Sequence, residues 1–179
     1  NPYLVDAPDV LLPSRTSTPA GLPLFTKGSQ PTDGGHLLLS ADERAELLSE
    51  DPDASSWIRR YVGADELLYD LPRYCLWLKD ASPHELKRHP GVMRRIRAVA
   101  ADREKSPTAS VRAMAQQPTL FTQDRQPATH YIAVPAHSSE NRRYVPLAFL
   151  GPETIASNAL RICVDATLFH FGVMSSAMH

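Results

Sequence analysis

The sequence lacks most of the features that would assign the chain to a common protein class. It has only two cysteines, Cys75 and Cys163, each in an apolar run typical of a strand. Because a lone disulfide or metal site is uncommon in a cytosolic protein, we interpret both as reduced core thiols. No stretch approaches the roughly 20 apolar residues that span a membrane, and no basic segment followed by an apolar one marks a signal peptide. We therefore expect a soluble, cytoplasmic protein without a membrane partner.

Motifs for catalysis and metal binding are missing as well. None of the seven histidines pairs with a cysteine or another histidine at the spacing of a zinc site. The core of many nucleases, in which a Pro-Asp pair is followed by Asp/Glu-x-Lys, is absent, as are the Gly-x-Ser-x-Gly turn of hydrolases and a glycine-rich phosphate loop. We expect no catalytic residue, no metal site and no cofactor site in this chain, so the sequence favours a binding function.

The charge is nearly balanced overall but unevenly distributed along the chain. The formal net charge is -1. Residues 1–80 contain 7 Lys or Arg against 13 Asp or Glu, whereas residues 81–112 contain 8 against 3. A basic helix face of this kind can follow the phosphates of a nucleic acid, and the acidic part can face another domain. The alternative is that the basic segment is simply a hydrated helix surface.

The first half of the chain mixes irregular segments with short elements. Six prolines in residues 1–34 predict an extended entry segment and loop with short edge strands. Residues 36–39 read as a strand, and Ser40 with Glu43 forms a capping-box pattern that predicts a helix over 41–49. We expect a second helix over 54–62, ended by Gly63 in the left-handed conformation. Residues 73–78 (RYCLWL) predict a strand because they are aromatic and β-prone.

The second half continues this mixed pattern. Ser82-Pro83 and Ser106-Pro107 are helix-start signals, and Val92, Ile96 and Val99 recur at the spacing of a buried helix face. Strands are expected over 131–134, 144–150 and 160–164, with a short helix near Pro152 and an apolar helix over 166–179. Without regular strand-helix alternation, the order favours an α+β fold, with a twisted mixed or mostly antiparallel sheet and several flanking helices in one domain.

A glycine-containing loop, Lys27 to Gly35 (KGSQPTDGG), is the first candidate binding feature. Its glycines let the backbone approach another backbone closely, its amides can meet phosphate oxygens, and Lys27 adds positive charge. Ser29, Thr32 and Asp33 complete this candidate set. The structural alternative is a tight turn into the next strand, in which Thr32 and Asp33 bond their own backbone.

A polar turn between two predicted strands is the second candidate. It contains Ser138, Ser139, Glu140, Asn141, Arg142 and Arg143. Arginine can bond bidentately to guanine and asparagine to adenine, while glutamate accepts from cytosine and serine commonly contacts phosphate. A hairpin tip with this set can read base edges, whereas the plain interpretation is a hydrated turn.

Aromatic residues lie within the hydrophobic runs, and we assign them to the core rather than to base stacking. They are Trp57, Trp77, Phe121, Phe149, Phe169 and Phe171.

Three segments carry a resemblance to a known family. They are GSQPTDGGHLLLS (28–40), RYCLWLKDASP (73–83) and HSSENRRYVPLAFLGPETIASNALRICVDATLFHFGVMSSAMH (137–179). Together they resemble the target-recognition region of the MmeI-like, single-chain (type IIL/IIG) adenine-N6 DNA methyltransferase and restriction-modification proteins, from the first residue to the last.

The resemblance implies that residues 35–179 form a target-recognition domain, cut from a larger bacterial protein within a C-terminal helix. It implies double-stranded DNA as a partner, together with an upstream methyltransferase domain of the same chain. S-adenosylmethionine and the chemistry would belong to that upstream domain, which flips the adenine out of the stack. The alternative is a docking or dimerisation module that never reads bases, in which the acidic half and the basic helix are complementary docking faces.

Overall fold

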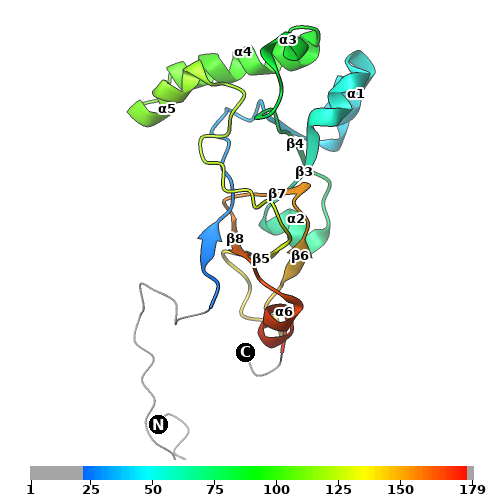
Figure 1. Cartoon of the computed structure of the whole chain (residues 1–179), viewed down its shortest axis with the longest axis vertical. Coiled ribbons are helices and arrows are strands. Elements are labelled where there is room, and N and C mark those ends of the chain that lie inside the picture. Colours follow the sequence, from blue (N-terminus) through cyan, green and yellow to red (C-terminus); the bar gives the residue numbers. More distant parts are fainter. Residues whose placement is uncertain (1–21, 177–179) are drawn as a thin grey trace, which may run out of the picture.

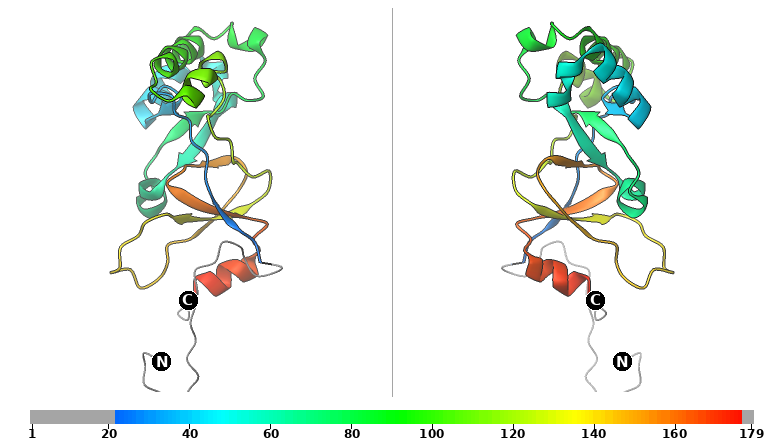
Figure 2. Two further views of the ribbon diagram at one scale, coloured as in Figure 1. Left: turned by 90° about the vertical axis from the view of Figure 1, so that its left-hand side faces the viewer. Right: turned by 90° about the vertical axis from the view of Figure 1, so that its right-hand side faces the viewer.

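The computed structural model describes residues 22–176, which form an elongated molecule (Figure 1). Four helices gather at one end, two sheets with one helix beside them occupy the middle, and one short helix lies at the other end (Figures 1 and 2). The strands are β1 (Phe25–Lys27), β2 (Leu38–Leu39), β3 (Ile58–Val62), β4 (Tyr74–Leu76), β5 (Tyr131–Pro135), β6 (Ala148–Leu150), β7 (Thr154–Ala156) and β8 (Leu160–Val164). The helices are α1 (Ala41–Glu50), α2 (Ala64–Tyr69), α3 (Pro83–Leu86), α4 (Pro90–Glu104), α5 (Ala109–Ala113) and α6 (Leu168–Met174), with 3-10 turns η1 (Pro52–Trp57) and η2 (Met114–Gln116).

One sheet is antiparallel throughout, in the order β1-β8-β5-β6. Its central strands, β5 and β8, coincide closely with two of the predicted strands and are largely buried. The expected edge strand of the entry segment is β1, which pairs with β8; residues 1–21 of that segment lie outside the described residues. The third predicted strand, 144–150, is confirmed only as the short β6.

The second sheet is mixed, in the order β2-β4-β3-β7, with β3 and β7 running parallel. The helix predicted over 54–62 is wrong, because η1 ends at Trp57 and β3 follows. The β-prone residues Ile58, Tyr61 and Val62 gain burial in the sheet that an isolated helix would not provide. The fold is therefore α+β, as predicted, but its strands form two four-stranded sheets.

Two further local predictions are corrected by this sheet. Gly63 has a φ of -103° and precedes α2 as its N-cap residue, so it does not end a helix in the left-handed conformation. The short helix expected near Pro152 is the strand β7, whose Ile155 and Ala156 are buried beside β3. In both segments, the parallel pairing of β3 with β7 set the local structure.

Two helix starts follow the sequence signals closely, whereas the start expected at Ser106-Pro107 is wrong, because α5 begins at Ala109 after Thr108. Ser40 and Ser82 both accept a hydrogen bond from the third helical amide, and the glutamate at that position bonds back, which completes each capping box. The helix after Ser82 divides into α3 and α4 because Pro90 has no amide to continue the first helix and instead begins the second.

The helical end has its own core. Val92, Ile96 and Val99 are buried along one face of α4, as their spacing predicted. They belong to a cluster with Leu47 of α1 and residues of the mixed sheet. A second cluster joins the two sheets, and a third lies between the antiparallel sheet and α6.

The aromatic assignments are partly wrong. Phe121 is buried and Trp57 and Trp77 pack against the main core, but Phe149 is 37% exposed and Phe169 is 74% exposed. Phe149 lies on an edge strand, and α6 covers the sheet with the face that carries Phe171. A short terminal helix buries one face only, so Phe169 on another face remains in solvent.

Both cysteines are free and buried, as predicted, and burial raises the pKa of each thiol. They lie in different sheets, Cys75 on β4 and Cys163 on β8. Within residues 22–176, no helix is long and apolar enough to span a bilayer.

Candidate nucleic-acid interface

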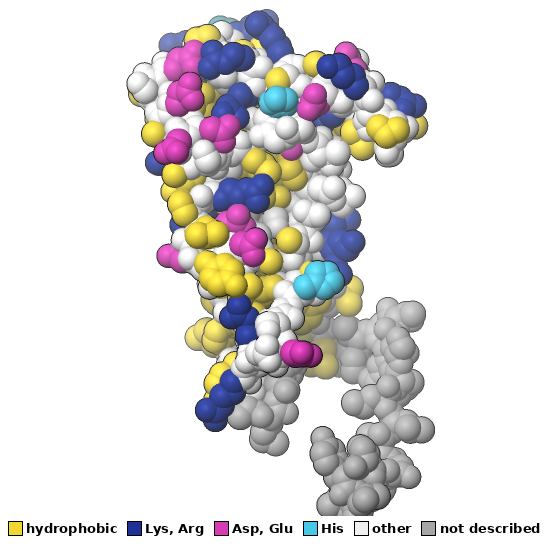
Figure 3. Space-filling view, turned by 180° about the vertical axis from the view of Figure 1, so that it is seen from behind, with side chains coloured by type: hydrophobic (Ala, Val, Ile, Leu, Met, Phe, Trp, Pro, Cys, Tyr) yellow, Lys and Arg dark blue, Asp and Glu magenta, His cyan; other side chains and the backbone are white. Residues whose placement is uncertain are grey.

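The loop between β5 and β6, residues 136–147, is the most exposed part of the sheet region. Residues 137 through 145 are all exposed. The back view shows basic side chains on a protrusion at its lower end (Figure 3). The polar turn identified in the sequence is therefore at the surface and reachable by a large ligand.

The turn is held by its own backbone and leaves most of its side chains uncommitted. The Arg142 amide donates to the Ser139 carbonyl at 3.2 Å, and the Asn141 amide donates to Ser139 Oγ at 3.2 Å. The Arg143 guanidinium lies over the Tyr144 ring, 5.2 Å from its centroid. Ser139 thus shapes the turn, while Glu140 and Arg142 have no ion-pair or hydrogen-bonded side-chain partner within the described part of the chain.

A shallow cleft of about 250 Å³ separates this turn from the end of α6. Its lining combines the serines and arginines of the turn with Tyr144, Val145, Pro146, Met174 and Ser176. Arginine and serine side chains beside an open cleft are suited to bases or phosphates. The structure brings Ser138, Ser139, Arg142 and Arg143 together there, and Glu140 and Asn141 lie exposed between them.

The Lys27–Gly35 loop approaches another backbone closely, and that backbone belongs to this chain. A Cβ on Gly28 would lie 2.3 Å from the carbonyl oxygen of Ser157. The Gly28 amide donates to Leu160 O at 3.1 Å and the Ser29 amide to Ala156 O at 2.7 Å. These two amides hold the loop against the turn between β7 and β8, so they are not available to phosphate.

Most candidate side chains of this loop are also committed inside the protein. Ser29 is fully buried, and its Oγ accepts from the Arg125 amide at 3.0 Å. Asp33 is buried and accepts from the Leu37 amide, while the Thr32 hydroxyl bonds that of Thr122 at 2.9 Å. Asp33 therefore bonds its own backbone, as the structural alternative expected, whereas the side chains of Thr32 and Ser29 bond residues 122 and 125. Lys27 is the exception, because its side chain is exposed on β1.

Arg103 holds this loop in place, although the sequence suggested it as part of a basic surface. Its side chain is 1% exposed. All five of its N–H groups donate to backbone carbonyls, those of Pro31, Thr32, Met114, Gln117 and Leu120, at 2.7–3.1 Å. Burial lowers the pKa of the guanidinium, and Asp33 partly opposes that effect. The spacing of Val92, Ile96 and Val99 continues to position 103, which was the signal that could have identified this residue as buried.

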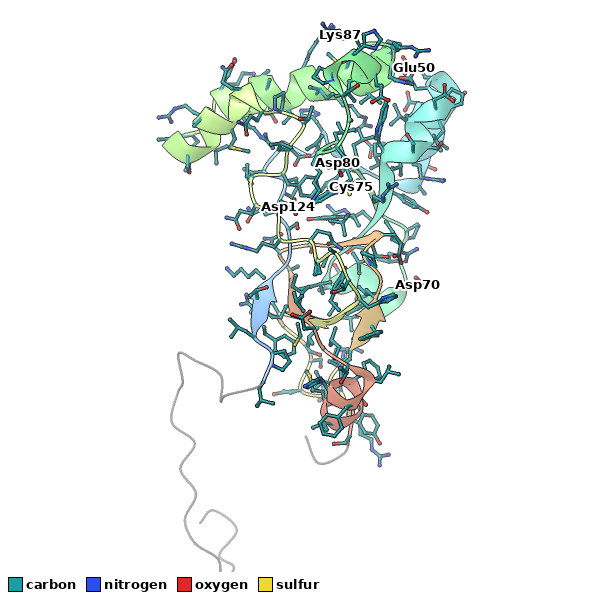
Figure 4. All side chains as sticks on the ribbon, in the orientation of Figure 1. Glu50, Asp70, Cys75, Asp80, Lys87 and Asp124 are labelled. Carbon is teal, nitrogen blue, oxygen red and sulfur yellow. The ribbon has the colours of Figure 1, made fainter. Side chains whose placement is uncertain are left out.

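Two further arginines of the basic segment pair with the acidic helix α1. Arg94 bonds Glu50 through two contacts at 2.7 and 3.1 Å, and Arg95 contacts Glu43 at 3.0 Å. The hydrogen bond from Arg94 lowers the pKa of Glu50, and the Ser40 amide followed by Arg95 lowers the pKa of Glu43. Figure 4 shows Glu50 of α1 and Lys87, which follows α3, at the same end of the molecule. The two oppositely charged parts of the sequence therefore meet within one molecule through these two ion pairs.

Metal chemistry finds no support within residues 22–176. They contain no group of three histidine, cysteine, aspartate or glutamate side chains arranged to hold a metal ion. The available chemistry is that of hydrogen-bond donors and positive charge on an exposed loop.

Comparisons with known proteins agree on one family. Residues 6–179 match the family described as "MmeI, target recognition domain". The chain is 34% identical over 179 residues to DNA methyltransferase A of Bacillus subtilis strain 168, and it covers 20% of that protein. A solved structure of the type IIL restriction-modification enzyme MmeI in complex with DNA superposes with a TM-score of 0.88 and 36% identity, covering 99% of this chain and 24% of that one.

These relatives are therefore much longer, and the chain corresponds to one part of each. Because the match runs from residue 6 to the last residue, the chain belongs to the MmeI target recognition domain family.

Proposed function

We propose that this domain recognises the double-stranded DNA target of a bacterial restriction-modification methyltransferase. The observation that carries the proposal is the exposed β5–β6 loop, whose Glu140, Asn141 and Arg142 are displayed in solvent. Residues of these types can pair with base edges in the major groove. The similarity to a DNA methyltransferase and to an enzyme solved with DNA supports the same assignment.

The complete protein then acts as an adenine-N6 methyltransferase in the cytoplasm. S-adenosylmethionine and the catalytic residues lie in an upstream domain. The recognition domain selects the DNA sequence. An adenine must leave the base stack before its amino group can be methylated, and the recognition domain holds the flanking duplex during that step.

The docking alternative loses its main support. It relied on the acidic half and the basic helix as complementary faces for another domain or protomer. Glu43 and Glu50 instead contact Arg95 and Arg94 of the same molecule, so part of each charged face is already paired within the domain.

Substitutions in the loop test the recognition function in the complete protein that carries this domain. Arg142→Ala and Asn141→Ala should each relax specificity at one base position, by about 5- to 150-fold, if the side chain reads a base. The measurement is a map of methylated adenines in a genome that expresses each variant. Lys105→Ala, on an exposed residue at the end of α4, is the matched control and should leave the map unchanged.

The two kinds of contact give different results. Loss of a phosphate contact weakens binding to all sequences alike and lowers the salt slope by about 1, whereas loss of a base contact changes the recognised sequence. Retention of both the wild-type methylation map and the wild-type affinity by all loop variants would count against this loop as the reading element.

A further inference from the structure

Two cations face each other across neighbouring strands of the antiparallel sheet. The register places Lys27 of β1 directly opposite Arg161 of β8, which has Val134 of β5 on its other side. Directly opposed residues of an antiparallel pair share one sheet face, with Cβ atoms about 4.5–5.5 Å apart. Lys27 is exposed and Arg161 is half-buried, so this pair lies side by side at the surface.

A third cation, Arg125, belongs to a segment whose backbone contacts the chain beside this pair. The Arg125 amide donates to Ser29 Oγ, two residues after Lys27, and the Arg125 side chain is exposed. Asp124, the neighbouring acid, contacts Lys79 at 3.0 Å and is already neutralised. In Figure 4, Asp124 lies between the helical end and β1.

Within the described residues, none of these three cations lies within 4.0 Å of a carboxylate. Like charges directly opposite one another destabilise a sheet. The fold nevertheless places Lys27 opposite Arg161, and Gly28 allows the close approach of this segment to the turn between β7 and β8. An anionic ligand at this surface neutralises the positive charge that these side chains place there.

The cluster lies at the base of the β5–β6 loop. The Ala136 amide, where the loop leaves β5, donates at 2.9 Å to the carbonyl of Ala159, two residues before Arg161. A closed loop of 12 residues (136–147) reaches at most about 20 Å from its base. The major groove of B-DNA is about 12 Å wide. The tip can therefore contact base edges while the base of the loop meets the sugar-phosphate backbone.

We infer that Lys27, Arg125 and Arg161 form a phosphate clamp that positions duplex DNA beneath the reading loop. The inference rests on the proposed function and adds residues and a role to it. Guanidinium groups can bond phosphate oxygens bidentately, and lysine adds a point charge. The four arginines of residues 113–179 are Arg125, Arg142, Arg143 and Arg161, so all of them belong either to the clamp or to the loop.

The test compares the wild type with the double variant Lys27→Gln/Arg161→Gln in the complete protein. Equilibrium binding is measured to a duplex with the methylation site and to a scrambled duplex, over about 50 to 200 mM salt. Each lost phosphate contact lowers the slope of log affinity against log salt by about 0.9. We expect a decrease of about 2 for the double variant, equal weakening on both duplexes, and an unchanged preference between them.

Two further variants separate charge from structure. Arg161→Lys keeps the positive charge and should retain the wild-type slope, and Lys105→Gln removes a distant exposed charge and should leave the slope unchanged. Arg125→Gln, whose side chain is exposed, should lower the slope by about 1 on its own. Thermal unfolding of each variant reports whether the fold is intact.

The outcomes also separate the clamp from the reading function. A folded double variant with the wild-type slope would overturn the clamp, even if the wild type selects its site normally. A wild type that binds both duplexes equally, with a lowered slope in the double variant, would overturn the reading function and support the clamp. A wild type that binds neither duplex would overturn both.

Discussion

Replacement of Arg103 by methionine should destabilise the fold more than any exposed charge substitution on α4. Methionine fills much of the same space but cannot donate to the five carbonyls that the guanidinium bonds. Hydrogen bonds to charged groups contribute about 1.5–3 kcal/mol each, and a buried acceptor left without a partner costs about 1–3 kcal/mol.

Two effects reduce the sum of these terms. Methionine avoids the cost of burying a charge, which is several kcal/mol. Four of the five bonds are only partly buried, so water can reach some of the carbonyls. We therefore expect a net loss of about 3–5 kcal/mol in the free energy of unfolding, a large share of the roughly 5–15 kcal/mol of a typical domain.

The assay is thermal and urea unfolding followed by circular dichroism. A loss of this size lowers Tm by about 6–20 °C for a chain of this length. Arg103→Lys has three donors and should lie between wild type and methionine, because at least two carbonyls stay unbonded. Arg97→Met, exposed on the same helix, should change the free energy by no more than about 0.5 kcal/mol. Equal unfolding of the Arg103 and Arg97 methionine variants would refute the reasoning.

The remaining predictions concern two glycines and one tyrosine. Gly28→Ala should destabilise the chain by about 1–3 kcal/mol in urea unfolding, because the new Cβ meets the Ser157 carbonyl at 2.3 Å. Gly172→Ala should stabilise it by up to about 1 kcal/mol, since a helical Cβ there meets nothing within 4 Å; a loss in that variant would contradict the geometry. Burial raises the pKa of Tyr131 to about 12, so the unfolded chain loses this proton first, near pH 10. Stability should therefore fall as the pH rises from about 10 to about 12, and Tyr131→Phe should show a smaller fall in urea unfolding at matched pH.

Local signals in the sequence predicted several elements well. The capping boxes at Ser40 and Ser82 are completed within four residues of chain, so they form without a distant segment. The same holds for the polar turn at 138–143, which lies between two apolar, β-prone segments and is therefore exposed. Strands β5 and β8 were predicted because their apolar runs are bounded by turn-forming residues.

Predictions that depended on a distant partner were less successful. Residues 58–62 and 154–156 are strands because each provides the other with a parallel neighbour, although their paired positions Tyr61 and Ile155 lie 94 positions apart in the sequence. The basic segment looked like a surface, yet Arg103 is buried and Arg94 is paired with α1. Spacing indicates which side of a helix is apolar, but it does not show what a charged side chain meets there.

The sequence alone determined the family through its resemblance and the α+β class through the order of its elements. It also determined the capped helix starts at Ser40 and Ser82 and the exposed polar turn, because these depend on contacts between near neighbours. Only the tertiary structure decided how eight strands divide into two sheets and which cations stay at the surface. Positions 27, 125 and 161 are distant in the sequence and come close only when β1 pairs with β8 and the Arg125 amide bonds Ser29. The partners of a charged side chain are likewise fixed only when distant segments pack.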